Sequence, residues 1–143
     1  LEEMRVGDVC RKAERVPSVA PSTRFEKLRE LVLASEDATL PVVDDQGRLV
    51  GLVTAEQLRP VFDERQLDGV VVASDVAAPP VALLPDDDLY RAHELFRESS
   101  CPQLPVIEPL EGDDPRRGRI LGMLDYRDMM RAYEVELARR REA

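Results

Sequence analysis

The sequence predicts an α/β (α+β) domain in which two pseudo-symmetric β-α-β-β-α repeats pack through their sheets. The first observation is a duplicated segment, because Leu40-Pro41-Val42-Val43 recurs as Leu104-Pro105-Val106-Ile107. The second is that the next apolar segment, Leu49–Val53, recurs as Ile120–Leu124. The third is a hydrophobic content of 43%, which is close to the globular norm and sufficient for a core. Two copies of one unit therefore account for most of the chain.

The first repeat is expected to begin with a short strand at Val16–Val19. A helix follows, because apolar residues then recur at helical spacing. These residues are Phe25, Leu28, Leu31 and Val32. The two duplicated segments form a hairpin, since the polar run Asp44–Gly47 between them is typical of a tight turn. A second helix is expected to start at about Thr54.

The second repeat is expected to contain the same elements in the same order. A short strand at Val81–Leu84 precedes a helix, whose first turn is flanked by the acids Asp86-Asp87-Asp88. The apolar positions of this helix are Leu89, Ala92, Leu95 and Phe96. The hairpin turn is stretched to Glu108–Gly118, and the last helix runs from about Asp125 towards Arg141.

A single repeat buries little apolar surface, because short strands with helices on one side leave the other face of the sheet uncovered. Packing two copies face to face covers both sheets. We therefore expect the first repeat at residues 1–62, including an N-terminal linker segment, and the second at 70–132. Residues 63–69 form the linker between them, and residues 133–143 form a C-terminal helical tail.

Composition excludes several classes of function. Twenty basic and 29 acidic residues give a net charge of −9, whereas a nucleic-acid partner requires a basic face. The longest strictly apolar run, Val70–Ala73, is far shorter than the roughly 20 residues of a membrane span. A single histidine gives no acid–base or nucleophilic centre, so we expect no enzyme. Cys10 and Cys101 form no metal motif, so we expect no metal. Because the chain begins with Leu1 rather than with methionine, we expect a piece of a longer protein. The lack of an apolar span, of a secretory signal and of a disulfide pattern predicts a soluble, intracellular fragment.

The order of these motifs resembles a tandem CBS domain, a regulatory module found as paired repeats in many unrelated proteins. The resemblance is carried by the two Leu-Pro-Val strands, by Gly51 and Gly122, and by Asp8-Val9 and Asp75-Val76 at the start of each copy. It extends from Val6 to Met129. The resemblance implies a regulatory role and a fold made of two paired repeats.

A narrower resemblance concerns the host protein. Residues 114–124 and 130–137 are similar to the carboxyl end of prokaryotic CLC-type chloride channels and transporters. This implies a transmembrane chloride-transport domain on the same polypeptide, with the module on the cytoplasmic side of the cell membrane. Arginine-rich segments at 116–119 and 139–141 would suit a contact with the anionic inner leaflet. Magnesium transporters, inosine-monophosphate dehydrogenases and free-standing proteins carry the same module, so a nucleotide sensor of another host is the alternative.

CBS pairs commonly bind adenine nucleotides such as ATP, ADP or AMP, through a hydroxyl at a helix start and a carboxylate one turn later. The first copy has the hydroxyl of Thr54, but Gln57 replaces the carboxylate. The second copy has the carboxylate of Asp128, but Asp125 replaces the hydroxyl. The resemblance therefore implies Asp128 as the main nucleotide contact, with the other three as further candidates. The simpler interpretation is helix capping, by Thr54 with Gln57 and by Asp125.

Self-association is also expected, because CBS pairs usually meet in twos. We expect a homodimer with a two-fold axis, formed by apolar residues of the helices that follow the two hairpins. These residues are Leu58, Val61, Phe62, Met129, Met130 and Tyr133. A ligand-free dimerisation module is the third interpretation, since each copy retains half of the nucleotide signature.

Overall fold

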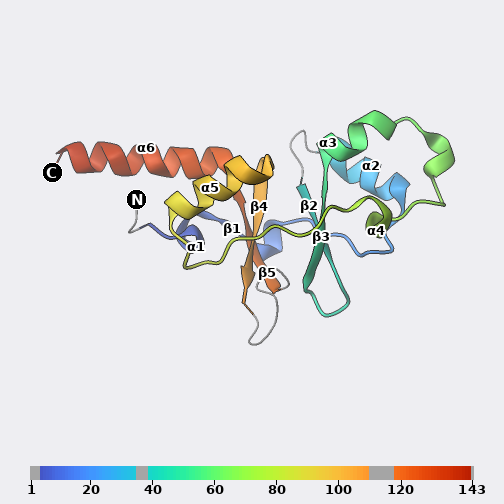
Figure 1. Cartoon of the computed structure of the whole chain (residues 1–143), viewed down its shortest axis with the longest axis horizontal. Coiled ribbons are helices and arrows are strands. Elements are labelled where there is room, and N and C mark those ends of the chain that lie inside the picture. Colours follow the sequence, from blue (N-terminus) through green and yellow to red (C-terminus); the bar gives the residue numbers. More distant parts are fainter. Residues whose placement is uncertain (1–3, 35–38, 110–117, 143) are drawn as a thin grey trace.

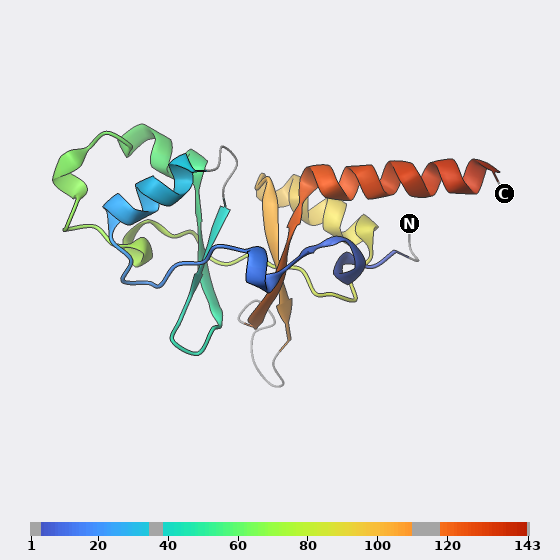
Figure 2. The same ribbon diagram turned by 180° about the vertical axis from the view of Figure 1, so that it is seen from behind.

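The computed structural model describes residues 4–34, 39–109 and 118–142. Two antiparallel hairpins lie side by side at the centre of the molecule, with the helices of the first repeat on one flank and those of the second on the other (Figures 1 and 2). One sheet has the order β1-β5-β4 and the other pairs β2 with β3. The mixed fold of two helix-covered hairpins agrees with the predicted class.

The first repeat contains a helix, a hairpin and a short second helix. Their bounds are α2 (Phe25–Leu33), β2 (Thr39–Val43), β3 (Leu49–Thr54) and α3 (Ala55–Leu58). The hairpin turn is tight because Asp44 Oδ1 accepts the backbone N–H groups of Gln46 and Arg48, each at 2.9 Å. Gly47 completes this turn with φ of 80°, a conformation that favours glycine.

The second repeat has the same order with a longer last helix. Its elements are α5 (Leu89–Ser99), β4 (Gln103–Glu108), β5 (Arg119–Asp125) and α6 (Tyr126–Glu142). The pairing of β4 with β5 has an irregularity between Val106 and Ile107, and the pairing of β2 with β3 has one between Val42 and Val43. The duplication therefore extends to the local distortion of each hairpin.

The two short strands predicted ahead of the helices are reduced to single parallel bridges, Val19 with Val42 and Leu83 with Val106. The N–H of Val19 donates to Pro41 O at 3.0 Å, and its carbonyl accepts from Val43 N at 2.8 Å. A parallel ladder would continue two residues to either side, where Pro17 and Pro21 have no N–H to donate. Proline therefore limits the ladder at Val19 to one residue.

The segment that precedes each repeat in the sequence packs against the other repeat. The additional elements are α1 (Val6–Val9), β1 (Arg11–Lys12), η1 (Ala13–Arg15) and α4 (Ala73–Val76). The N–H of Val6 donates to Asp87 O at 2.8 Å, and β1 pairs with β5 of the second repeat. Conversely, the N–H of Ala73 donates to Thr23 O in the first repeat at 2.8 Å. The segment at 6–12, assigned by sequence to the first repeat, therefore packs against the second.

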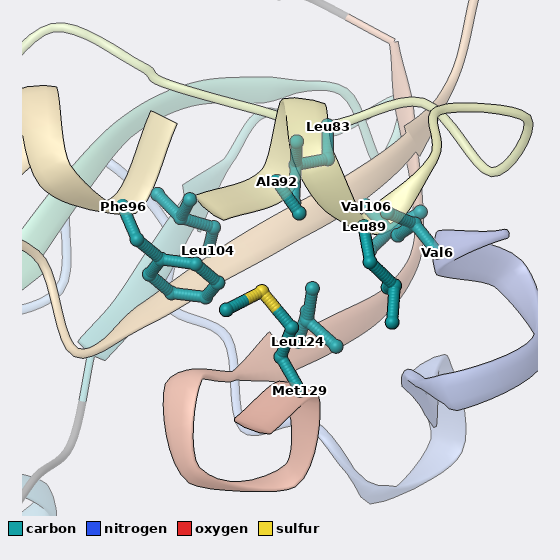
Figure 3. Close-up of a cluster of buried hydrophobic side chains, with 9 residues drawn as sticks. All are labelled: Val6, Leu83, Leu89, Ala92, Phe96, Leu104, Val106, Leu124 and Met129. Carbon is teal, nitrogen blue, oxygen red and sulfur yellow. The ribbon is translucent and has the colours of Figure 1, made fainter. Parts of the chain in front are cut away.

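Each repeat has its own apolar core. Figure 3 shows the second core, where side chains from α1, α5, α6 and both strands of the hairpin converge. The first core is formed in the same way by α2, α3, α4 and the β2–β3 hairpin. Leu49, Leu52 and Ile107 join the two hairpins in a third, smaller cluster.

Two of the residues predicted for a dimer interface are core residues, which is a correction to the sequence analysis. Leu58 is 0% exposed in the first core and Met129 is 2% exposed in the second. Leu58 lies on α3 and Met129 on α6, the helices that follow the two hairpins, and each side chain packs into the core of its own repeat. Their apolar character therefore reflects the packing of the repeat itself.

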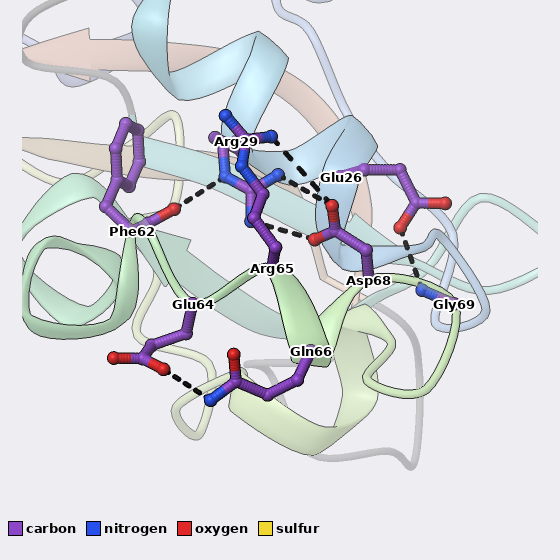
Figure 4. A network of polar contacts seen from close by, with 8 residues as sticks. All are labelled: Glu26, Arg29, Phe62, Glu64, Arg65, Gln66, Asp68 and Gly69. Carbon is purple, nitrogen blue, oxygen red and sulfur yellow. Dashed lines mark hydrogen bonds and ion pairs between the residues drawn. The ribbon is translucent and has the colours of Figure 1, made fainter.

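The linker between the repeats is held to α2 by a polar network (Figure 4). It follows a short turn of 3-10 helix, η2 (Arg59–Val61), and contains a second one, η3 (Arg65–Leu67). The buried Arg29 guanidinium donates to Phe62 O at 2.6 Å and to both carboxylate oxygens of Asp68, at 2.8 and 3.1 Å. Gly69 N donates to Glu26 Oε2 at 3.1 Å. The hydrogen bond from Arg29 lowers the pKa of Asp68, although burial alone would raise it.

Candidate functional site

An open cleft of about 1170 Å³ lies between the two repeats. We call it the inter-repeat cleft, and it is lined by residues 54–57, 99–102 and 125–127 together with side chains from α5 and from the segment at 78–81. Its volume is comparable with that of small-molecule sites in proteins. The two strand-to-helix junctions that carry the predicted signature both contribute to its wall.

At the β3–α3 junction, Thr54 and Gln57 form a capping box. Thr54 Oγ1 accepts the backbone N–H of Gln57 at 3.3 Å, and Gln57 Oε1 accepts the backbone N–H of Thr54 at 2.9 Å. The capping interpretation of this pair is thereby confirmed. Both side chains also line the cleft, so a ligand there would meet residues already fixed by the helix start.

At the β5–α6 junction, Asp125 is an almost buried carboxylate with 4% exposure. It accepts the backbone N–H of Arg127 at 2.8 Å, which confirms its role as a helix cap. The Arg127 side chain forms an ion pair with it at 3.5 Å, and Gln103 Nε2 donates to it at 3.1 Å. Burial raises the pKa of Asp125, but the hydrogen bonds from Gln103 and Arg127 outweigh burial and leave it below the usual value. Asp125 is therefore ionised at neutral pH.

Gln103 connects this carboxylate to the other repeat. Its Oε1 accepts the backbone N–H of Thr39 at 3.1 Å, while its amide group donates to Asp125. Thr39 is 2% exposed, and its hydroxyl has no hydrogen-bond partner among the described residues. A continuous polar connection therefore runs from the cleft wall to the first strand of the first hairpin.

The lining of the cleft carries more positive than negative groups, although the chain as a whole is strongly acidic. Arg59, Arg97 and Arg127 line it, against the carboxylates of Glu56 and Asp125. Guanidinium groups are well suited to bind phosphate or carboxylate oxygens. The cleft is therefore compatible with an anionic ligand.

One wall of the cleft is aromatic. Tyr126 is 39% exposed, and its ring meets the buried ring of Phe96 edge-on, with centroids 5.4 Å apart and an angle of 76°. The centroid of the His93 imidazole lies 6.4 Å from the centroid of the Tyr126 ring. Sequence reasoning missed Tyr126, Arg59 and Arg97 as cleft residues. The position of Tyr126 immediately after the signature residue Asp125 was the one available signal.

Asp128, the main nucleotide contact implied by sequence, does not line the inter-repeat cleft. Its carboxylate lies 3.4 Å from Arg131 Nη1 and 3.9 Å from Arg11 Nε. Arg11 in turn borders a smaller hollow of about 480 Å³ formed by residues 10–12, 14 and 15. The structure therefore brings Thr54, Gln57 and Asp125 together in one cleft and places Asp128 outside it.

Four predicted interface residues retain partial exposure. Val61 and Phe62 pack against the first core, and Met130 packs against the second. Tyr133 is half-buried on α6. These side chains lie on the helical flanks of the molecule rather than in the inter-repeat cleft.

Within the described residues, no group of His, Cys, Asp and Glu side chains could hold a metal ion. Cys101 lines the cleft, but burial raises the pKa of its thiol, which is therefore protonated at neutral pH. No helix in the ranges 4–34, 39–109 and 118–142 is long and apolar enough to cross a membrane. The cleft therefore presents polar groups that can bind a ligand, and its thiol is not activated.

A family model described as the CBS domain matches residues 6–64 and 72–135. The inosine-5'-monophosphate dehydrogenase of Aquifex aeolicus is 22% identical over 117 residues, which cover 80% of this chain and 22% of that protein. The enzyme of the same name from Mycobacterium bovis is 29% identical over 99 residues, which cover 69% of this chain and 17% of that protein. The chain thus spans about a fifth of the length of the curated relatives that it matches.

Solved structures align over most of the chain. The structure of CBSX2 in complex with AMP is 28% identical with a TM-score of 0.73, covering 90% of this chain and 95% of that one. CBSX2 from Arabidopsis thaliana is 25% identical with a TM-score of 0.77, covering 94% and 96%. The CBS domain of a bacterial CNNM/CorC family Mg²⁺ transporter in complex with ATP is 18% identical with a TM-score of 0.71, covering 90% and 86%. At that identity, the last comparison shows the fold alone.

Proposed function

This chain belongs to the CBS domain family, and on that premise we propose that it is a regulatory module that binds an adenine nucleotide in its inter-repeat cleft. CBS pairs are regulatory modules, so the proposed output is a change in a host protein rather than a reaction on the nucleotide. Nucleotide binding would stabilise the relative position of the two repeats, because both contribute to the cleft wall.

The excess of arginine in the cleft carries this proposal. Arg59 and Arg97 reach the cleft from different repeats, so one anionic ligand between them would contact both halves of the molecule. CBSX2, at 28% identity over 90% of this chain, has been solved with AMP. Asp125 opposes a phosphate placed beside it, since like charges repel at short range. We therefore expect the monophosphate AMP to bind at least as tightly as ATP.

Titration calorimetry with AMP, ADP and ATP tests the proposal, with inorganic phosphate as the control ligand. Arg97→Gln removes a cleft guanidinium and should weaken AMP binding about tenfold. Arg91→Gln is the matched control, because Arg91 lies on the same helix, is exposed and does not line the cleft. Asp125→Thr restores a hydroxyl and removes a charge, so it should tighten binding.

Two results would contradict the proposal. The first is that neither the wild type nor Asp125→Thr releases or absorbs heat with AMP, ADP or ATP at millimolar concentration. That result would favour the ligand-free dimerisation module. A loss of binding in Asp128→Ala with none in Arg97→Gln would place the ligand in the hollow near Arg11 instead.

For the host, we propose a chloride-transporting membrane protein, with this module on the cytoplasmic side and its arginine-rich tail at 139–141 near the inner leaflet. The support is the sequence similarity of residues 114–124 and 130–137, of which residues 114–117 lie outside the described ones. The relatives reported above, inosine-5'-monophosphate dehydrogenase and CBSX2, belong to other hosts. A nucleotide sensor of such a host is therefore the alternative. Sequencing the gene upstream of Leu1 distinguishes them, because a chloride transporter requires many apolar helices there.

We also propose that the module forms a homodimer with a two-fold axis. The support is the partial exposure of Val61, Phe62, Met130 and Tyr133 on the helical flanks, whereas Leu58 and Met129 are excluded by their burial. Sedimentation equilibrium at tens of micromolar should give twice the monomer mass. Tyr133→Asp should shift the protein towards monomer, and a strictly monomeric wild type would contradict the proposal.

A further inference from the structure

Tyr126 is an exposed aromatic ring on the wall of the inter-repeat cleft. We propose that this ring is the platform on which the flat part of the ligand stacks. The inference rests on the proposed function, so the stacked group is the adenine ring of an adenosine nucleotide. Nothing in the sequence signature assigns a binding role to this position.

The packing around Tyr126 holds its ring in place. Phe96, which is 4% exposed in the second core, contacts it edge-on at 5.4 Å and 76°. In an edge-on pair one ring presents its edge to the face of the other, so Phe96 covers at most one face of Tyr126. The exposure of 39% agrees with this, because a ring sandwiched on both faces would be buried. A tyrosine fixed in this way loses little further conformational freedom when a ligand binds.

The chemistry of the surrounding cleft selects a class of ligand. Arg97 lies one residue beyond Phe96 on α5, and it lines the same cleft as Tyr126. The wall therefore combines a flat ring for a base with a guanidinium for a phosphate. A nucleotide has both of these groups, whereas a sugar phosphate has only the second. Stacking on an aromatic side chain tolerates any base, but a purine offers the larger surface.

The alternative is that Tyr126 only covers Phe96 and stabilises the second core. Such a role would change the stability of variants without changing their ligand affinity. The two roles can be separated because tyrosine fluorescence reports on stacking directly. The sequence contains three tyrosines and no tryptophan, so tryptophan emission does not mask the tyrosine signal, and the part due to Tyr126 is identified by its loss in Tyr126→Phe.

The experiment titrates AMP into the protein while following both heat and tyrosine fluorescence. In the wild type, stacking should quench part of the fluorescence as the site fills. Tyr126→Phe should keep the affinity within about twofold and lose the quenching, since phenylalanine stacks but does not contribute the signal. Tyr126→Ala should weaken AMP binding about tenfold to one-hundredfold. Tyr90→Phe is the control, because Tyr90 is 65% exposed, does not line the cleft, and should keep both affinity and quenching.

Ribose 5-phosphate, which lacks the base, separates stacking from phosphate binding. Used as a competitor of AMP, it should bind the wild type and Tyr126→Ala equally. If the wild type binds AMP and Tyr126→Ala binds it as tightly, the platform is refuted while the proposed function stands. Quenching that persists in Tyr126→Phe would also refute it, and does not depend on the alanine variant folding. If the wild type binds no nucleotide, the proposed function itself fails.

Discussion

Gln103 on β4 accepts the backbone N–H of Thr39 on β2 at 3.1 Å, and the two residues occupy the same position in the two repeats. Each is the first residue of its strand, and each pairs across its hairpin with a signature residue, Thr39 with Thr54 and Gln103 with Asp125. The approximate symmetry of the duplication therefore brings equivalent residues into direct contact. In this contact the backbone N–H of Thr39 is the donor and the side-chain Oε1 of Gln103 is the acceptor.

Replacing Gln103 should destabilise the fold. Gln103→Leu leaves the buried N–H of Thr39 without its acceptor and removes a donor from Asp125, which together cost about 1–3 kcal/mol of unfolding free energy. Urea unfolding measures this difference. The control is Gln66→Leu, because Gln66 is exposed and, among the described residues, its side chain donates only to the nearby Glu64. The loss of unfolding free energy in this control should be below about 0.5 kcal/mol. Equal effects of the two substitutions would show that the connection contributes nothing.

A charged substitution at the same position should reverse the pH dependence. In Gln103→Glu a second carboxylate faces Asp125, and such a pair retains a proton because both cannot ionise at short range. The folded state then binds more protons than the unfolded state, so stability rises as the pH falls. We expect the deficit of this variant relative to the wild type to be largest at pH 7 and smaller at pH 5. A deficit of the same size at both values would contradict the pairing.

Loss of the capping hydroxyl should cost stability at the cleft. Thr54→Ala removes the acceptor of the Gln57 N–H and should lower the unfolding free energy by about 1 kcal/mol. Ser74→Ala is the matched control, since Ser74 is exposed near the start of α4 and no side-chain hydrogen bond is found for it among the described residues. Thermal unfolding of both variants makes the comparison. A control as unstable as Thr54→Ala would refute the cap.

Arg29, which anchors the linker, should contribute more to the unfolding free energy than the exposed Arg65. Arg29→Met leaves Asp68 and Phe62 O without their donor and should lower the melting temperature by several degrees. Arg65→Met is the control, because Arg65 approaches the same Asp68 at 4.0 Å and is 73% exposed. Arg29→Lys should not restore stability, since an ammonium cannot reproduce the two-pronged contact with the carboxylate. Rescue by lysine would indicate that charge alone matters.

Acid should destabilise the protein through two carboxylates with lowered pKa values. The hydrogen bond from Arg29 lowers the pKa of Asp68, and that of Asp125 is lowered despite its burial. Unfolded aspartate titrates near about 3.9, so the unfolded chain takes up protons first as the pH falls. The contribution of Asp68 and Asp125 to the unfolding free energy is therefore complete above about pH 5. It is lost as the pH falls through the lowered pKa values that these two carboxylates have in the folded state. Urea midpoints at successive pH values should show this decline, and Asp68→Asn should make it shallower than Asp45→Asn, which removes the same charge from an exposed turn.

Much of the fold could be predicted because repetition is visible in the sequence itself. The duplicated Leu-Pro-Val strands, the hairpins and the helices all have the expected order, and the capping roles of Thr54 and Asp125 follow from local sequence. Local pattern failed for the leading strands, because the prolines that flank Val19 restrict pairing to one bridge. It also failed for Leu58 and Met129, because an apolar residue on a short helix can face either a partner or its own core.

The candidate site was less predictable than the fold. The signature identified Thr54, Gln57 and Asp125, which share one cleft, but it also included Asp128, which lies outside that cleft. Arg59, Arg97 and Tyr126 were missed because they reach the cleft from separate elements that only the tertiary structure brings together. The exchange of leading segments was likewise invisible, since the pairing of β1 with β5 involves residues at opposite ends of the chain.

That exchange has a consequence for biosynthesis. A chain leaves the ribosome amino end first, yet Arg11 and Val6 find their partners only at Met123 and Asp87. The backbone of α1 therefore finds its partner once Asp87 has been synthesised, whereas β1 remains unpaired until β5 has been synthesised. A chain halted before β5 would present the apolar Val6 to chaperones and proteases, so closure of the first segment onto the last strand distinguishes a finished product from an interrupted one.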